Sequence, residues 1–123
     1  MKLKFVICGL EHSGTTLVSD IFRQIPKVDS GFECGVLLAD SPRAFLSVQP
    51  FYNNVPGGWQ ISEDTLREIC EAGSFSAFYQ QLYEKSGFFD ANVEYLFDKT
   101  PRYFQQLYSC QTKVNVPFIA TYK

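Results

Sequence analysis

The sequence has no surplus of positive charge and no long apolar run. Its 123 residues carry 11 Lys and Arg against 13 Asp and Glu, so the net charge is −2. A general nucleic-acid binder needs a basic face, and this composition therefore speaks against nucleic acid as a partner. No segment approaches the roughly 20 apolar residues that span a bilayer. The apolar run at residues 3–8 is also shorter than the roughly 7–15 residues of a signal peptide, so we expect no membrane segment.

Cysteine and histidine are too few and too scattered for a structural zinc site. The chain has one histidine and no C-x-x-C pair, and its cysteines are Cys8, Cys34, Cys70 and Cys110. Structural zinc sites use closely spaced ligand pairs, so we expect no metal. Free cysteine commonly lies buried as a small apolar residue. We therefore favour reduced thiols and a cytoplasmic protein, although an even count also permits two disulfides.

The pattern that is present is one of strands alternating with helices. Residues 3–8 form an apolar run that ends at Gly9, which indicates a buried strand of a parallel sheet. A helix is predicted over residues 14–25, before Pro26, because apolar side chains recur at helical spacing at Leu17, Val18, Ile21, Phe22 and Ile25. Further strands are expected within residues 28–32, 93–98 and 116–122. This alternation predicts a single α/β domain, residues 1–123, with a mostly parallel sheet.

Three later helices have recognisable start signals. Ser62 and Ser74 each precede a helical pattern and are predicted as N-caps. Thr100 followed by Pro101 is typical of an N-cap and first helical position, so we expect a helix from there to about Cys110.

Residues 40–60 are rich in proline and glycine among aromatics. We predict an irregular excursion with about one helical turn there. The aromatic side chains of "PFYNNVPGGW", residues 50–59, have two interpretations that the sequence leaves open. They stack on a sugar or phenol ligand, or they form a satellite core under a long loop.

The last predicted strand, residues 116–122, has no helix after it. In a parallel sheet each strand normally leads into a helix that covers one face. We therefore expect the domain to be incomplete. We also expect marginal stability, because such a sheet exposes apolar edges and faces.

The segment "GLEHSGTT", residues 9–16, has the glycine frame of a phosphate-binding loop without its lysine. The P-loop of nucleoside triphosphatases reads G-x-x-x-x-G-K-[ST]. Here Gly9 and Gly14 keep the spacing, and Thr15 stands where the lysine would be. Backbone N–H groups at a helix N-terminus can still face an anion. Without a lysine for the β and γ phosphates, a smaller anion is favoured; alternatively, "SGTT" merely starts a helix.

Two segments resemble the sulfotransferase family. "FVICGLEHSGTTLVSDIF" is similar to its 5′-phosphosulfate loop, which often reads as a basic residue followed by S-G-T-T. "LFDKTPRYF", residues 96–104, resembles a second segment in which a strand ends in Lys-[ST]-Pro. The resemblance implies an N-terminal portion of a P-loop-like three-layer α/β/α fold. It also implies 3′-phosphoadenosine 5′-phosphosulfate (PAPS) as co-substrate, without a metal, and sulfuryl transfer to a hydroxyl or amine of a small molecule, glycan or peptide.

The resemblance also implies roles for individual residues. His12 takes the place of the family's loop Lys or Arg, a departure because imidazole is only partly charged near neutral pH. The 5′-phosphosulfate is surrounded by Ser13, Gly14, Thr15 and Thr16. Glu33 matches the glutamate base of glycan and tyrosyl members, and Lys99 contacts the donor's bridging oxygen or sulfonate. Whether Arg102 faces acceptor or solvent is left open, and the family's 3′-phosphate ligands would follow the end of this chain.

Two other functions compete with this hypothesis. A P-loop kinase-like enzyme is disfavoured by Thr15 in place of lysine and by the lack of a Walker B-like acidic strand end. A non-catalytic anion-binding module would keep the fold without turnover. By analogy with P-loop domains we expect the first strand to be central, between the strand within 93–98 and the last strand.

Overall fold

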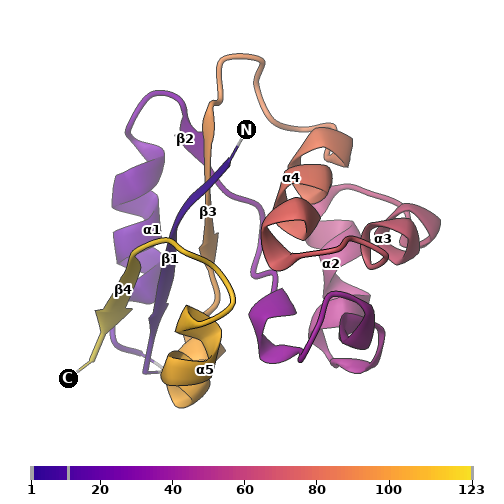
Figure 1. Cartoon of the computed structure of the whole chain (residues 1–123). Coiled ribbons are helices and arrows are strands. Elements are labelled where there is room, and N and C mark those ends of the chain that lie inside the picture. The colour runs from indigo at the N-terminus through magenta and orange to yellow at the C-terminus, as the bar shows by residue number, and fades with distance from the viewer. Residues whose placement is uncertain (1, 11, 123) are drawn as a thin grey trace.

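The computed structural model describes residues 2–10 and 12–122, and its centre is a four-stranded sheet (Figure 1). The strands are β1 (Lys2–Gly9), β2 (Val28–Asp29), β3 (Tyr95–Lys99) and β4 (Phe118–Thr121). They lie in the order β2-β3-β1-β4, and every pair is parallel. The prediction of an α/β protein with a parallel sheet is therefore confirmed, and so is the place of β1 between β3 and β4.

Short helices connect the strands. The α-helices are α1 (Thr15–Arg23), α2 (Phe51–Trp59), α3 (Glu63–Ile69), α4 (Phe75–Lys85) and α5 (Leu107–Gln111), and the 3₁₀ helices are η1 (Val36–Leu38), η2 (Arg43–Ser47) and η3 (Pro101–Gln106). Ser62 and Ser74 accept hydrogen bonds from the N–H groups three residues later, as N-caps should, so both predicted caps are confirmed. Within the described part of the chain, no helix has the length and apolar character that crossing a bilayer requires.

Helices cover both faces of the sheet. On one face Phe22 of α1 lies against Phe5 and Phe97, with ring centroids 4.6 and 6.3 Å apart. Their chain neighbours Val6 and Leu96 point to the opposite face, because side chains alternate along a strand. There they join the main core with α2, α3 and α4, which lie across the sheet from α1 (Figure 1).

The cysteines are free and buried, as the sequence predicted. Burial raises the pKa of Cys8 to about 11, and it does the same for Cys70 and Cys110. For Cys34, which is completely enclosed, burial raises the pKa well above its ordinary value. These thiols are thus kept protonated by their apolar surroundings.

The prediction of an irregular excursion at residues 40–60 was wrong. The segment forms η2 and then α2, a helix that continues through Pro56. Its buried side chains are Tyr52, Val55 and Trp59, which recur at helical spacing. Burying this face outweighs the hydrogen bond that proline cannot donate. Tyr52 and Trp59 therefore belong to the core, as the second interpretation predicted, whereas Phe51 is only partly buried.

Thr100 and Pro101 lie at the N-cap and first positions of a helix, as predicted, but the Thr100 side chain does not cap it. It makes no side-chain cap hydrogen bond, and the residues after it form the 3₁₀ helix η3 before α5 begins at Leu107. Its hydroxyl donates instead to the carboxylate of Asp98, at 2.8 Å. A buried carboxylate requires hydrogen-bond donors, and the Thr100 hydroxyl therefore bonds to Asp98 and not to the start of the helix.

The apolar stripe predicted for the first helix is only partly buried. Val18 and Phe22 face the sheet, whereas Leu17, Ile21 and Ile25 are 66%, 57% and 45% exposed. The two groups form adjacent rows of the same helix pattern, at spacing i, i+4. The sheet covers one row and leaves the other on the surface.

Candidate functional site

The predicted site lies at the carboxyl edge of the sheet. In the strand register Ile7 lies opposite Lys99, and Gly9 lies opposite Thr121. Strands β1, β3 and β4 therefore end together, and the loop at residues 9–16 leaves β1 at this point. Open parallel sheets bind ligands at this edge.

The loop leads into α1 through Gly14, which has the left-handed backbone φ of 93°. A side chain there would be strained by that φ, although a Cβ would meet no atom within 4 Å. Because glycine is the N-cap, no side chain caps the first N–H groups of α1, in contrast to α3 and α4. Uncapped N–H groups beside open space are suited to an anion.

The N–H and hydroxyl of Ser13 were expected to face a ligand, but both bond to the protein itself. Its N–H donates to the carbonyl of Leu10 at 3.2 Å, and its hydroxyl donates to the same carbonyl. The hydroxyl also lies 2.7 Å from Oγ1 of Thr121 in β4. Short polar side chains readily bond to nearby backbone in this way. Ser13 therefore ties the loop to β4, whereas the N–H groups of Gly14, Thr15 and Thr16 lie at the uncapped start of α1.

Glu33 and Lys99 are brought together although they are far apart in sequence. Oε2 of Glu33 lies 3.6 Å from Nζ of Lys99, and the side chains are only 24% and 17% exposed. Burial raises the pKa of Glu33 above its ordinary value, while the positive charge of Lys99 opposes that rise. The carboxylate is thus a stronger base than a solvated one.

Asp98 is a member of the site that the sequence analysis missed. Its side chain is 0% exposed, and its carboxylate accepts hydrogen bonds from Tyr79 at 2.5 Å, Tyr103 at 2.7 Å and Thr100 at 2.8 Å. The backbone N–H of Cys34 is a fourth donor, at 3.2 Å. Asp98 precedes Lys99, and Cys34 follows Glu33. The network therefore joins the two chain segments that carry the ion pair.

The charge of Asp98 is costly in this position. Burial raises its pKa above the ordinary value, and the hydrogen bonds from Tyr79, Tyr103, Thr100 and Cys34 lower it in part. The same burial raises the pKa of both tyrosines well above 10, so they are donors. The one signal in the sequence was an aspartate that continues the apolar strand "YLF", where a charge needs partners.

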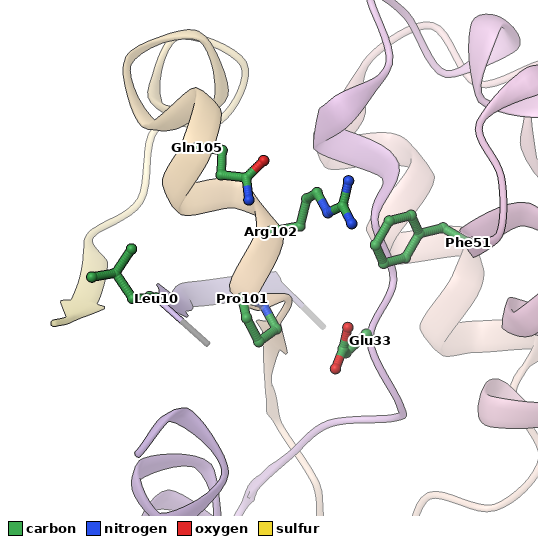
Figure 2. Close-up of a pocket in the computed structure, with 7 residues that line it drawn as sticks. Leu10, Glu33, Phe51, Pro101, Arg102 and Gln105 are labelled. Carbon is green, nitrogen blue, oxygen red and sulfur yellow. The ribbon is translucent and has the colours of Figure 1, made fainter. Parts of the chain in front are cut away.

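A pocket of about 250 Å³ opens beside Glu33 (Figure 2). It is lined by Gly9, Leu10, Glu33, Phe51, Pro101, Arg102 and Gln105. The structure thus places Arg102 at this pocket, with its side chain extended toward Phe51 (Figure 2). Of the remaining predicted residues, Thr15 is buried and Thr16 exposed. His12 is exposed, with φ of 58°, and is not among the described residues that line the pocket.

Comparisons of this chain with protein-family models, with curated proteins and with solved structures find no match. Within the described residues, no group of three or more His, Cys, Asp or Glu side chains is arranged to hold a metal ion. The loop, the ion pair and the pocket are therefore the features of the molecule that bear on its function.

Proposed function

We propose that this chain is part of a PAPS-dependent sulfotransferase with a P-loop-like fold, which transfers a sulfuryl group to a hydroxyl or amine. The observation that carries the proposal is the Glu33–Lys99 pair, 3.6 Å apart, at the carboxyl edge of a parallel sheet. A carboxylate base and a cation stand side by side at the edge where the loop into α1 leaves β1, and Glu33 also lines a pocket. Sulfuryl transfer needs these groups together.

The donor would be held by its 5′-phosphosulfate. The N–H groups of Gly14, Thr15 and Thr16 at the start of α1 are suited to an anion that carries no metal. His12 in the same loop, when protonated, adds a positive charge. A single phosphate with its sulfonate requires fewer cations than a triphosphate, which is consistent with a loop without lysine.

The proposed step uses Glu33 as base and Lys99 as the cation at the leaving group. Glu33 accepts the proton of the acceptor hydroxyl as its oxygen bonds to sulfur. The bond between sulfur and the phosphate oxygen breaks, and its electron pair leaves on adenosine 3′,5′-bisphosphate. Lys99 neutralises the charge that develops on that oxygen. The products are the sulfated acceptor, the bisphosphate and one proton.

The experiment compares binding of adenosine 3′,5′-bisphosphate with binding of ATP and magnesium, and then measures turnover of labelled PAPS with a panel of acceptors. Preference for the bisphosphate, with transfer that is lost in Glu33→Gln, would support the proposal. Preference for magnesium ATP would support a kinase-like enzyme instead. Bisphosphate binding without any transfer would indicate a non-catalytic anion-binding module.

The proposed acceptor is a small molecule, a glycan or a peptide that bears a hydroxyl, and the proposed setting is the cytoplasm. Four free, buried cysteines support that setting, because exported proteins more often pair their cysteines. Fractionation of cells that express the full-length protein would test the location.

A further inference from the structure

The pocket beside Glu33 contains an arginine without an ion-pair partner. Arg23, Arg43 and Arg67 each lie within 4 Å of a carboxylate. Arg102 forms no such pair with any residue in the described part of the chain, yet it lines the pocket. The nearby carboxylate of Glu33 is already paired with Lys99. The guanidinium of Arg102 is therefore available to an anion that enters the pocket.

The wall opposite Arg102 is an aromatic ring in a fixed position. Phe51 begins α2, and its ring packs directly on Gly35, where any Cβ would collide with it. Leu10 and Pro101 add further apolar surface. The cavity of about 250 Å³ is smaller than the roughly 300–1,000 Å³ typical of pockets for drug-sized ligands, so it suits one ring.

The polar groups of the pocket have distinct positions. Arg102 and Gln105 both come from η3 and lie on one side, whereas Glu33 lies below them, near Pro101 (Figure 2). Arginine presents a planar fork of donors that matches a carboxylate, and the glutamine amide can donate to the same group. A ligand with a carboxylate at one end and a hydroxyl at the other would satisfy both sides.

We propose that this pocket binds a ring that carries both a carboxylate and a hydroxyl, as in a uronic acid or a phenolic acid. Phe51 and Pro101 hold the ring, Arg102 and Gln105 bind the carboxylate, and the hydroxyl lies at Glu33. The fate of that hydroxyl rests on the proposed sulfuryl transfer, whereas binding of the ring does not. The inference thus names the acceptor class for the proposed enzyme.

The test is an NMR titration of the protein with two matched ligand pairs. Methyl glucuronide is compared with methyl glucoside, and para-hydroxyphenylacetate is compared with its amide. The carboxylate member of at least one pair should bind about tenfold more tightly, because a charge-assisted hydrogen bond is lost in the neutral member. The pair that shows the preference identifies the ring as sugar or phenol.

Variants assign the preference to individual residues. Arg102→Gln should bind both members of the pair equally, and Arg102→Lys should keep part of the preference, since lysine has the charge without the fork. Phe51→Leu should weaken both members alike. Arg43→Gln is the matched control, because Arg43 is exposed and paired with Glu71, and it should leave the preference unchanged.

Three results would overturn the inference: equal binding of both members of each pair, no binding of any ligand, or a preference for the carboxylate that survives in Arg102→Gln. A preference that depends on Arg102, without sulfuryl transfer to the same ligands, would support the inference and reject the proposed function. Sulfuryl transfer with no preference for a carboxylate would reject the inference alone.

Discussion

The backbone N–H of Cys34 donates a hydrogen bond to the buried carboxylate of Asp98, with 3.2 Å between nitrogen and oxygen. The two residues are 64 positions apart, and each is the chain neighbour of one member of the Glu33–Lys99 pair. This bond, with a second from the same N–H to Oγ1 of Thr100 at 3.2 Å, joins the segments that carry the base and the cation of the proposed site. It also makes Asp98 the residue on which the geometry of the site depends most.

Replacement of Asp98 should be strongly destabilising. Asp98→Ala removes an acceptor that four buried donors share, so we expect the free energy of unfolding to fall by more than about 3 kcal/mol. Urea unfolding followed by circular dichroism measures this loss. Asp40→Ala, at an exposed position, is the control and should change stability by less than about 0.5 kcal/mol. Similar losses in both variants would contradict the role given to the network.

The same carboxylate should make stability depend on pH. Because burial raises the pKa of Asp98, the native state binds more protons than the unfolded state between the two pKa values. The free energy of unfolding should then fall as the pH rises from about 4 through the native pKa. Asp98→Asn removes this contribution, so its stability relative to wild type should improve over that range. If the free energies of unfolding of wild type and Asp98→Asn differed by the same amount at every pH in this range, Asp98 would not titrate as inferred.

Lys99 should control the protonation of Glu33. Burial raises the pKa of Glu33 and Lys99 lowers it, so Lys99→Met should raise that pKa further. NMR titration of the Glu33 carboxyl carbon measures the shift without requiring activity. Lys85→Met, on the exposed end of α4, should leave the titration unchanged. An unshifted Glu33 in Lys99→Met would mean that the pair does not persist in solution.

Glu33 should be required for the proposed sulfuryl transfer but not for binding of the donor. Glu33→Gln should remove most turnover and leave donor affinity largely intact, because the base contacts the acceptor. Transfer from labelled PAPS and titration with adenosine 3′,5′-bisphosphate measure the two properties separately. Bisphosphate binding that is lost together with transfer in Glu33→Gln would contradict the role of Glu33 as a base for the acceptor.

The two rows of α1 should respond differently to substitution. Ile21 is 57% exposed, so Ile21→Gln should change the free energy of unfolding by less than about 0.5 kcal/mol. Phe22 packs against Phe5 and Phe97, and Phe22→Ala should cost about 3 kcal/mol. Thermal unfolding of the two variants provides the comparison. If Ile21→Gln were as costly as Phe22→Ala, the exposed row would have to be covered in solution.

Local rules were sufficient for much of this architecture. The strand, glycine loop and helix at the N-terminus follow from an apolar run, a glycine frame and helical spacing within about 25 residues. The caps Ser62 and Ser74 bond to groups three residues away, so their sequence context contains the whole interaction. The parallel sheet follows from the alternation of strands and helices.

Contacts between distant segments decided the rest. Pro56 remains inside α2 because the aromatic face of that helix is buried in the core. Thr100 keeps its predicted N-cap position, but its hydroxyl bonds to Asp98 and not to the helix. Arg102 lines a pocket that Phe51 closes from another part of the chain, which the local sequence could not show. Each outcome is set by burial and hydrogen bonding between segments far apart in sequence. Local preferences, even the penalty of about 3 kcal/mol for proline in a helix, cannot anticipate them.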